Sequence, residues 1–216
     1  EVHDNNTLFD KLYYSLRNTV EFAELDKKRP DDIQLLETIK AQHKLAAFIL
    51  LTSQGVPVLH LGQDFMRTKH GVENSYNSPD NINAVVWKRK MEFIDVFTYY
   101  KNLIDLRKQN SVFSLPLDVD VRKAIEFRND VFLADNQNAI GYTLDSEDKT
   151  IFVVINPYQY DINVNLKEDG WNMLLFGDDY FPENPLPLHS ANITVPRLSG
   201  AVFIKNKVEP SSVDKK

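Results

Sequence analysis

The residues best suited to chemistry stand at the start of the chain. Glu1-Val2-His3-Asp4-Asn5-Asn6 places an imidazole and a carboxylate after an apolar residue and before a helical pattern. In α/β folds this order is typical of the carboxyl-terminal tip of a strand, where such folds carry their chemistry. We therefore expect His3 and Asp4 to supply a proton donor and a carboxylate to a site. Because no strand precedes this tip, we expect the chain to be the second half of something larger.

A His-Asp pair alone is weak support for a site. Either residue is common at a turn or a helix cap, so the pair taken alone would more often be structural. What favours a site is position, since a second strand and a long polar loop would meet the same rim of a barrel. Three of the other histidines are not expected to join it, because His43 lies on a helix, His60 inside a strand and His189 in the second half. Metal binding through His3, Asp4 and His70 stays open.

The elements that would position this tip are helices and one buried strand. Apolar residues recur on one helix face over Asp10–Thr19, Ile33–Ser53 and Ala84–Asn110. Gly55 ends the second helix, and Val56–Leu61 then forms a continuous apolar run. Such a run indicates a strand buried on both faces of a parallel sheet.

The second half of the chain has the pattern of an antiparallel β-domain. Short β-branched segments separated by turn residues recur about every 8–12 residues, which favours a sandwich. Strands are expected at Lys123–Phe127, Val131–Ala134, Ala139–Leu144, Thr150–Asn156, Asp161–Asn165, Trp171–Phe176, Asn192–Val195 and Ala201–Lys205.

Chain length limits how these parts combine. A closed (β/α)8 barrel needs roughly 250 residues, and the first half offers only two strand–loop–helix units. We therefore expect an α/β plus all-β chain: residues 1–110 are the last units of an incomplete barrel, 111–207 a β-sandwich, and 208–216 a disordered tail or linker. The alternative is a small α+β domain that closes on its own helices.

A long polar loop follows the expected strand, from Gln63 to Asn83. Loops of this length after a parallel strand are uncommon and usually functional. Its hydrogen-bonding groups, combined with the flat faces of Tyr76 and Trp87, suit sugar rings; a solvated loop is the alternative. The candidate binding residues are Arg67, Asn77, Asp80 and Asn83.

Composition and charge exclude several classes of function. The chain of 216 residues is 43% apolar and 26% charged with a net charge of −6, which gives no reason to bind nucleic acid or an anionic membrane. It has no cysteine, and no apolar run approaches the ~20 residues that span a bilayer. Neither a nucleophile elbow nor a recognised metal-ligand spacing around His3, Asp4 and His70 is present.

Several stretches carry recognisable motifs. Residues 1–12, with the run His3-Asp4-Asn5-Asn6-Thr7, resemble the last of the four signature regions of the alpha-amylase superfamily of glycoside hydrolases, in the form seen in type I pullulanases. Gly55-Val56-Pro57, residues 62–69 and residues 74–83 resemble the eighth strand of that family and the loop after it. The β-domain matches the family in type and position.

The resemblance implies roles for individual residues. In that superfamily one aspartate attacks the anomeric carbon, a glutamate protonates the leaving oxygen and a third carboxylate stabilises the transition state. Asp4 would be the third carboxylate, and His3 and Asn5 would contact the sugar. A carboxylate kept ionised beside an oxocarbenium-like centre stabilises charge that exists only in the transition state. The loop residues Arg67, Asn77, Asp80 and Asn83 would line the donor-side glucose subsites.

The resemblance also implies a function. It points to the C-terminal portion of a pullulanase-like debranching enzyme that hydrolyses α-1,6-glucosidic linkages in pullulan, glycogen or starch with retention. The fragment alone would be inactive, because the nucleophile and the general acid lie upstream. Two alternatives stay open: a non-catalytic carbohydrate-binding or structural module, and a branching or α-1,4-acting member of the superfamily.

The expected partners follow from this reading. They are an α-glucan substrate and the missing N-terminal part of the barrel, whose absence would favour self-association of the fragment. No cofactor is expected; a structural calcium is compatible with the parent enzyme but is not indicated in this sequence. The sequence leaves the location open, with the cell exterior or surface favoured over the cytoplasm.

Overall fold

A computed structural model of the chain describes residues 5–19, 21–132 and 136–207. The chain divides into two compact units, which are described separately here. Unit 1 comprises Glu1–Leu51 and Val56–Asp105, and unit 2 comprises Thr52–Gly55 and Leu106–Lys216. His3, Asp4 and the predicted tail 208–216 lie outside the described residues.

Unit 1 is helical throughout its regular structure. Its elements are α1 (Leu8–Arg17), α2 (Pro30–Thr52), η1 (Gln63–Phe65), α3 (Asp80–Asn83), α4 (Arg89–Glu92) and α5 (Ile94–Gln109), with the last residues of α2 and α5 in unit 2. The first two predicted helices are confirmed to within a few residues. The third predicted helix, Ala84–Asn110, begins later than predicted, at Arg89. It is also interrupted, because Phe93 leaves the helical conformation and separates α4 from α5.

Helix α1 follows directly from local sequence signals. The Thr7 side chain accepts a hydrogen bond from the backbone N–H of Asp10, which is the standard N-cap contact, at 3.2 Å. At the other end Asn18 adopts the left-handed conformation that terminates helices. The helix buries Phe9 and Tyr13. The predicted amphipathic helix after the N-terminal tip is therefore present, and its N-cap lies just beyond that tip.

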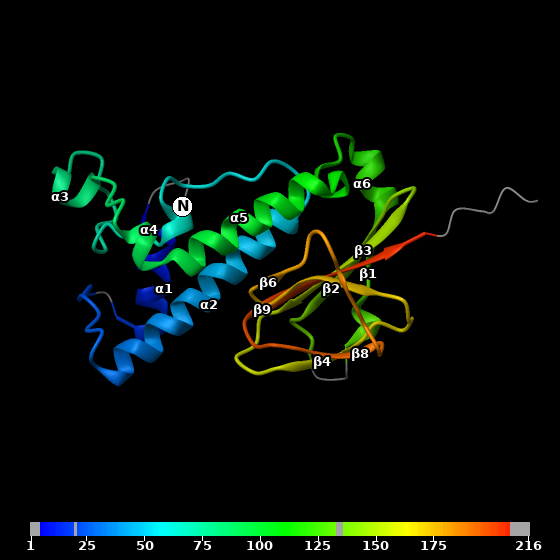
Figure 1. Cartoon of the computed structure of the whole chain (residues 1–216). Coiled ribbons are helices and arrows are strands. Elements are labelled where there is room, and N and C mark those ends of the chain that lie inside the picture. Colours follow the sequence, from blue (N-terminus) through cyan, green and yellow to red (C-terminus); the bar gives the residue numbers. More distant parts are fainter. Residues whose placement is uncertain (1–4, 20, 133–135, 208–216) are drawn as a thin grey trace, which may run out of the picture. The chain divides into compact units, whose positions relative to one another are not determined.

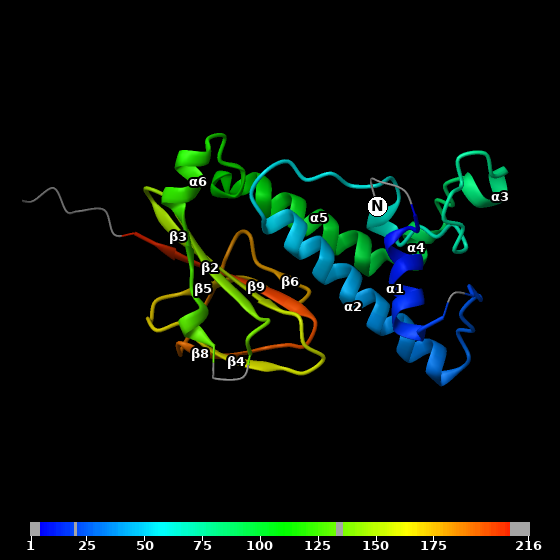
Figure 2. The same cartoon turned by 180° about the vertical axis from the view of Figure 1, so that it is seen from behind.

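Helices α2 and α5 lie side by side (Figure 1; Figure 2). Asp95 at the start of α5 accepts from Lys40 and Lys44 of α2 at 2.9 and 3.2 Å. The two lysines hold the pKa of this half-buried carboxyl below its usual range, against the effect of burial. The end of α2 is deeply buried at Leu45, Phe48 and Leu51.

The predicted strand Val56–Leu61 is wrong. This segment is irregular, and Val56, Val58 and Leu61 are 89%, 54% and 58% exposed. Among its described residues, unit 1 contains no strand. A parallel strand exists only where neighbouring strands accept its backbone hydrogen bonds, so an apolar run without neighbouring strands forms no part of a sheet.

Unit 2 contains two antiparallel sheets. Its strands are β1 (Ile125–Phe127), β2 (Ile140–Asp145), β3 (Lys149–Asn156), β4 (Ile162–Asn165), β5 (Asn172–Phe176), β6 (Asp179–Tyr180), β7 (Leu186–Pro187), β8 (Asn192–Val195) and β9 (Ser199–Asn206). The larger sheet has the order β1-β2-β3-β9-β5-β6, with β7 also paired to β5, and β4 pairs with β8 in the smaller sheet. Figure 2 shows β4 and β8 as a separate layer below the large sheet.

One buried cluster joins the two sheets. Phe152, Val154, Ala201 and Phe203 come from one face of β3 and β9, and their partners come from the small sheet and the segments beside it. Those partners include Ile162, Val164, Leu166, Trp171 and Val195. Because side chains alternate between the two faces of β3 and β9, every second residue enters the core shared by both sheets, and the residues between them are buried on the opposite face.

Two predicted strands in this unit need correction. Residues 118–124 form helix α6 (Asp118–Ala124), so only Ile125–Phe127 of the first predicted strand is extended. Acidic residues open α6, basic residues close it, and Asp118 pairs with Arg122 at 2.8 Å, all of which favour helix. The predicted strand Val131–Ala134 begins in the short helix η3 (Asn129–Val131) and makes a single bridge from Phe132 to Val164; residues 133–135 lie outside the described part.

The C-terminal end of α2 is capped inside unit 2. The Arg107 guanidinium donates to the carbonyls of Ser53 and Gly55, each at 2.6 Å, and the Tyr142 hydroxyl donates to the carbonyl of Thr52 at 3.0 Å. Burial raises the pKa of Tyr142 to about 12, so the hydroxyl stays a donor. Carbonyls at a helix end need such partners, and here β2 and α5 supply them.

Phe152 should be a main contributor to the stability of unit 2. It is fully buried and its ring lies 5.6 Å from that of Trp171. Phe152→Ala should lower the free energy of unfolding by about 3–5 kcal/mol, because it leaves a cavity in the shared core. Chemical denaturation followed by circular dichroism measures this. The matched control is Phe127→Ala on the neighbouring sheet edge, which is 65% exposed and should cost less than about 1 kcal/mol. Equal losses for both variants would contradict the core assignment.

Candidate functional site

The long loop after residue 60 folds back onto the start of α1. The Asp10 carboxylate, in the first turn of that helix, is fully buried. It accepts from the Thr68 hydroxyl at 2.5 Å and from the backbone N–H of Lys69 at 2.9 Å. One side chain therefore connects the segment that follows His3-Asp4 to a loop almost sixty residues later.

Gly71 forms the second connection to the N-terminal segment. Its carbonyl accepts from the Asn6 side-chain amide at 3.1 Å and from the Tyr14 hydroxyl at 3.3 Å. Gly71 has a positive φ of +76°, and an added Cβ would lie 1.8 Å from the Tyr14 hydroxyl oxygen. Only glycine fits this position. Asn5 comes directly before Asn6, is exposed and also has a positive φ, of 81°.

Arg67 and Asn83 lie inside the loop and hold it together. The buried Arg67 guanidinium donates to the carbonyl of Leu61 at 3.3 Å and to that of Asn83 at 2.5 Å. The Asn83 amide donates to the carbonyls of Ser75 and Ser78 at 2.6 and 2.9 Å. Contact of these two residues with a sugar stays a prediction, and the geometry gives both a positioning role.

The other two predicted loop residues face solvent. Asn77 and Asp80 are exposed, next to Tyr76, whose side chain is 85% exposed. Further along the loop, the Trp87 ring is 62% exposed and lies 5.6 Å from that of Phe65. Polar groups and flat aromatic faces thus occupy one loop, which is the combination that pyranose rings require.

His43, which the sequence did not connect to this loop, supports its beginning. The imidazole is fully buried and its Nε2 lies 2.7 Å from the Gln63 carbonyl, to which it donates. The Gln63 amide in turn donates to the Tyr100 hydroxyl at 3.1 Å. Burial lowers the pKa of His43 to about 4, so the ring is neutral near pH 7. Ile39 and Ala47, four residues before and after His43, lie on the same helix face and are fully buried. This spacing of apolar residues was the sequence signal from which the burial of His43 could have been predicted.

Two classes of site are not indicated in the part of the chain that the structure describes. No three His, Cys, Asp or Glu side chains there are grouped to hold a metal ion. Within the same residues, no helix has the length and apolarity needed to cross a membrane.

Known proteins resemble the chain over most of its length. It is 34% identical over 190 residues to a pullulanase of Bacillus subtilis (strain 168), a match that covers 86% of this chain and 24% of the relative. The crystal structure of pullulanase type I from Bacillus subtilis str. 168 complexed with maltose superposes with a TM-score of 0.77 at 29% identity, covering 95% of this chain and 26% of the other. An isoamylase of a Flavobacterium species is 38% identical over 60 residues, which are 28% of this chain and 8% of the relative. No protein-family model matches the chain.

These similarities place the chain in a debranching glycoside hydrolase family. Within it, the chain is a pullulanase-type segment, as the N-terminal motifs predict. The chain spans about a quarter of the length of the pullulanases that it matches.

Asp10 should control the order of the loop. Asp10→Ala removes the acceptor for Thr68 and Lys69, leaves their donors unpaired and should destabilise the loop by about 2 kcal/mol. Hydrogen exchange measures this locally, as faster exchange of the Lys69 and His70 amides. Asp31→Ala, at an exposed position in the first turn of α2, is the control. Unchanged protection in the Asp10 variant would contradict the anchoring role.

The neutral His43 gives unit 1 a defined pH dependence. Its pKa in the folded chain is about 4, below the ordinary value of 6.5, so the unfolded chain binds more protons between these values. Stability contributed by the neutral ring is therefore complete above about pH 6.5 and is lost as the pH falls toward about 4. Denaturation midpoints measured across this range should fall with pH, and less so in His43→Gln. An equal slope in both proteins would exclude His43 as the cause.

Proposed function

We propose that the chain is the C-terminal part of a debranching enzyme that hydrolyses α-1,6-glucosidic linkages in an α-glucan with retention. The observation that carries this is the connection of two motif regions, since Asp10 and Asn6 tie the segment after His3-Asp4 to the loop 67–83. The resemblance to pullulanases, including one complexed with maltose, supports the choice of substrate class.

Asp4 is assigned the role of the carboxylate that stabilises the transition state. Two residues further on, the Asn6 side chain is held by the Gly71 carbonyl. An ionised carboxylate beside the anomeric carbon stabilises the oxocarbenium-like charge as the glycosidic bond breaks. His3 and Asn5 are assigned hydrogen bonds to hydroxyl groups of the same sugar, which restrain its ring.

The loop is assigned the binding of the glucan chain. Asn77 and Asp80 are exposed and present an amide and a carboxylate to a substrate, while Arg67 and Asn83 fix the backbone that carries them. Preorganised groups of this kind lower the entropy cost of holding the sugar in a reactive position.

The parent enzyme is expected to complete unit 1. Val56, Val58 and Leu61 expose apolar surface that upstream strands of a (β/α)8 barrel would cover, turning this run into its eighth strand. The nucleophile and general acid belong to those strands, so the fragment alone should be inactive. The same exposed surface favours its self-association. In this arrangement residues 111–207 are the β-sandwich that follows the barrel.

Replacement of Asp4 in the full-length parent tests the assignment. Asp4→Asn keeps the size of the side chain and removes its charge, and should lower kcat by about 100- to 1,000-fold. The readout is the release of maltotriose from pullulan, with Asp31→Asn as a surface control.

Two results would overturn this proposal. Near-normal turnover in the Asp4 variant would end its catalytic assignment and favour a binding or structural module. Products of α-1,4 cleavage or of branch formation from the unmodified parent would assign a different specificity within the superfamily.

A further inference from the structure

The large sheet of unit 2 extends beyond the small sheet that covers it. Phe152 on β3 and Phe203 on β9 are cross-strand partners, and both are fully buried in the shared core. Two residues along the same strands and on the same face, Thr150 and Lys205 are also partners, but they lie at the surface of a groove. The same sheet face is therefore apolar core at one end and polar groove floor at the other.

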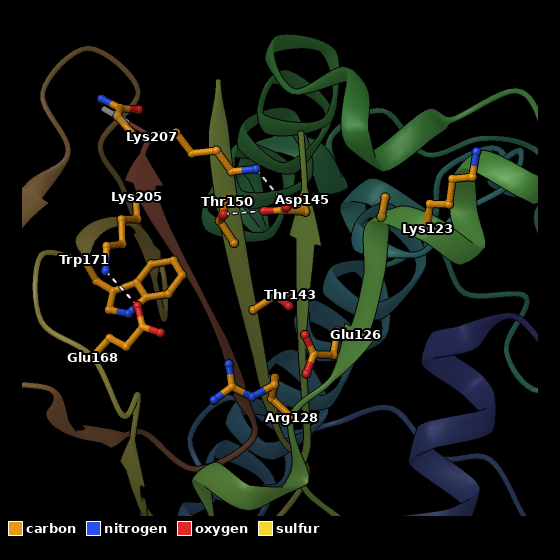
Figure 3. Close-up of a pocket in the computed structure, with 12 residues that line it drawn as sticks. Lys123, Glu126, Arg128, Thr143, Asp145, Thr150, Glu168, Trp171, Lys205 and Lys207 are labelled. Atoms are coloured by element: carbon orange, nitrogen blue, oxygen red, sulfur yellow. Dashed lines mark hydrogen bonds and ion pairs between the residues drawn. The ribbon is translucent and has the colours of Figure 1, made fainter. Parts of the chain in front are cut away.

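The floor of this groove is built from neighbouring strands in register. Asp145, Thr150 and Lys205 form one row across β2, β3 and β9. Glu126 and Thr143 form the next row across β1 and β2. Figure 3 shows these side chains pointing into one space, with Lys123 on one side and Trp171 and Glu168 on the other. The cavity volume is about 500 Å³, within the range of small-molecule sites.

Charges of both signs line the groove, with four cations (Lys123, Arg128, Lys205 and Lys207) and three carboxylates (Glu126, Asp145 and Glu168). Lys205 pairs with Glu168 at 2.8 Å, and Lys207 pairs with Asp145 at 2.8 Å. Each partner holds the pKa of its carboxyl below the usual range, although for Asp145 burial opposes the effect. A ligand with a net charge would therefore meet repulsion as well as attraction here. A hydroxyl group both donates and accepts, so a polyhydroxylated neutral ligand matches acceptor carboxylates and donor cations together.

Trp171 supplies the second, independent observation. Its indole lines the groove although it is only 4% exposed, with the Lys205 ammonium 5.7 Å from the ring centre. The indole N–H has no hydrogen-bond partner among the described residues. Buried donors without a partner are rare in folded proteins, and such a group is expected to pair with a water or a ligand. Lys205, which lies near the ring, is paired with the exposed Glu168, and such a pair is weak because water screens it.

We propose that this groove binds a neutral oligosaccharide, an α-linked glucan chain of a few residues. Its hydroxyl groups bond to Thr143, Glu168 and Asp145, and one of them displaces the Lys205–Glu168 pair to accept from the Trp171 indole N–H. The choice of an α-glucan among neutral saccharides rests on the function proposed above. Unit 2 would then hold glucan by its own contacts.

The test uses the 216-residue chain and maltohexaose as the probe. In a Trp87→Phe background Trp171 is the sole tryptophan, so one indole N–H resonance reports on the groove. Titration should shift that resonance saturably, and cellohexaose, with the other linkage, should leave it in place. No saturable shift with maltohexaose, an equal response to cellohexaose, or a response to inorganic phosphate instead would each overturn the proposal.

Matched variants locate the binding. Thr143→Val and Glu168→Gln, each removing one groove contact, should weaken maltohexaose binding about tenfold. Their controls are Thr194→Val on the outer strand β8 and Asp169→Asn beside Glu168, which should bind normally. Unchanged affinity in both groove variants, with the fold intact by circular dichroism, would exclude this groove.

The outcome is separable from that of the proposed function. The Trp171 resonance reports on the groove, whereas the products released from pullulan by the full-length parent report on the proposed function. If pullulan is cleaved by the parent but the indole resonance does not respond, only the groove proposal fails. If the groove binds maltohexaose but the parent forms other products, only the assigned specificity fails.

Discussion

The buried carboxylate of Asp10 is the constraint on which unit 1 depends. A carboxylate removed from water must be compensated by donors, and here the donors come from Thr68 and Lys69 of a distant loop. The same residue sits in the first turn of α1, where its negative charge also favours the helix N-terminus. The start of α1 and the loop therefore depend on each other for their structure. Arg67, Asn83 and Gly71 extend that arrangement through backbone carbonyls, so the loop has a defined shape without regular secondary structure.

Unit 2 follows a different rule, the alternation of side chains across a sheet. Every second residue of β3 and β9 enters the shared core as long as the small sheet covers it. Where this cover ends, the same alternation brings Thr150 and Lys205 to the surface, and Trp171 stands at the border between both regions. The groove is thus a consequence of two sheets of unequal size.

Much of this fold could be predicted from local patterns. Thr7, the apolar face of α2 and the β-branched runs of β2, β3, β8 and β9 carry their own signals, and the corresponding elements are present. The strand predicted at Val56–Leu61 is absent, because its pattern describes an environment of neighbouring strands that the described residues of unit 1 do not contain. The short strands β6 and β7 are fixed by their pairing with β5 and have no periodic signal.

The sequence predicted which residues belong to the site better than it predicted the role of each residue. Arg67 and Asn83 were candidate sugar contacts because of their polarity, yet their hydrogen bonds go to loop carbonyls, which no composition reveals. His43 was set aside as a helix residue, and its contact with Gln63 depends on tertiary packing. The motif around His3 and Asp4 was the sequence signal that identified the family, because a signature region constrains the types of several adjacent residues at once.

The central claim is that this chain completes a glucan-cleaving site at the tip that His3 and Asp4 occupy. A crystal structure of the full-length parent with a bound maltooligosaccharide tests it most directly. We expect the Asp4 carboxylate beside the anomeric carbon of the bound sugar, Asn77 or Asp80 in contact with the same chain, and Val56–Leu61 hydrogen-bonded into a parallel sheet. A sugar bound away from Asp4, with residues 56–61 still outside any sheet, would contradict it.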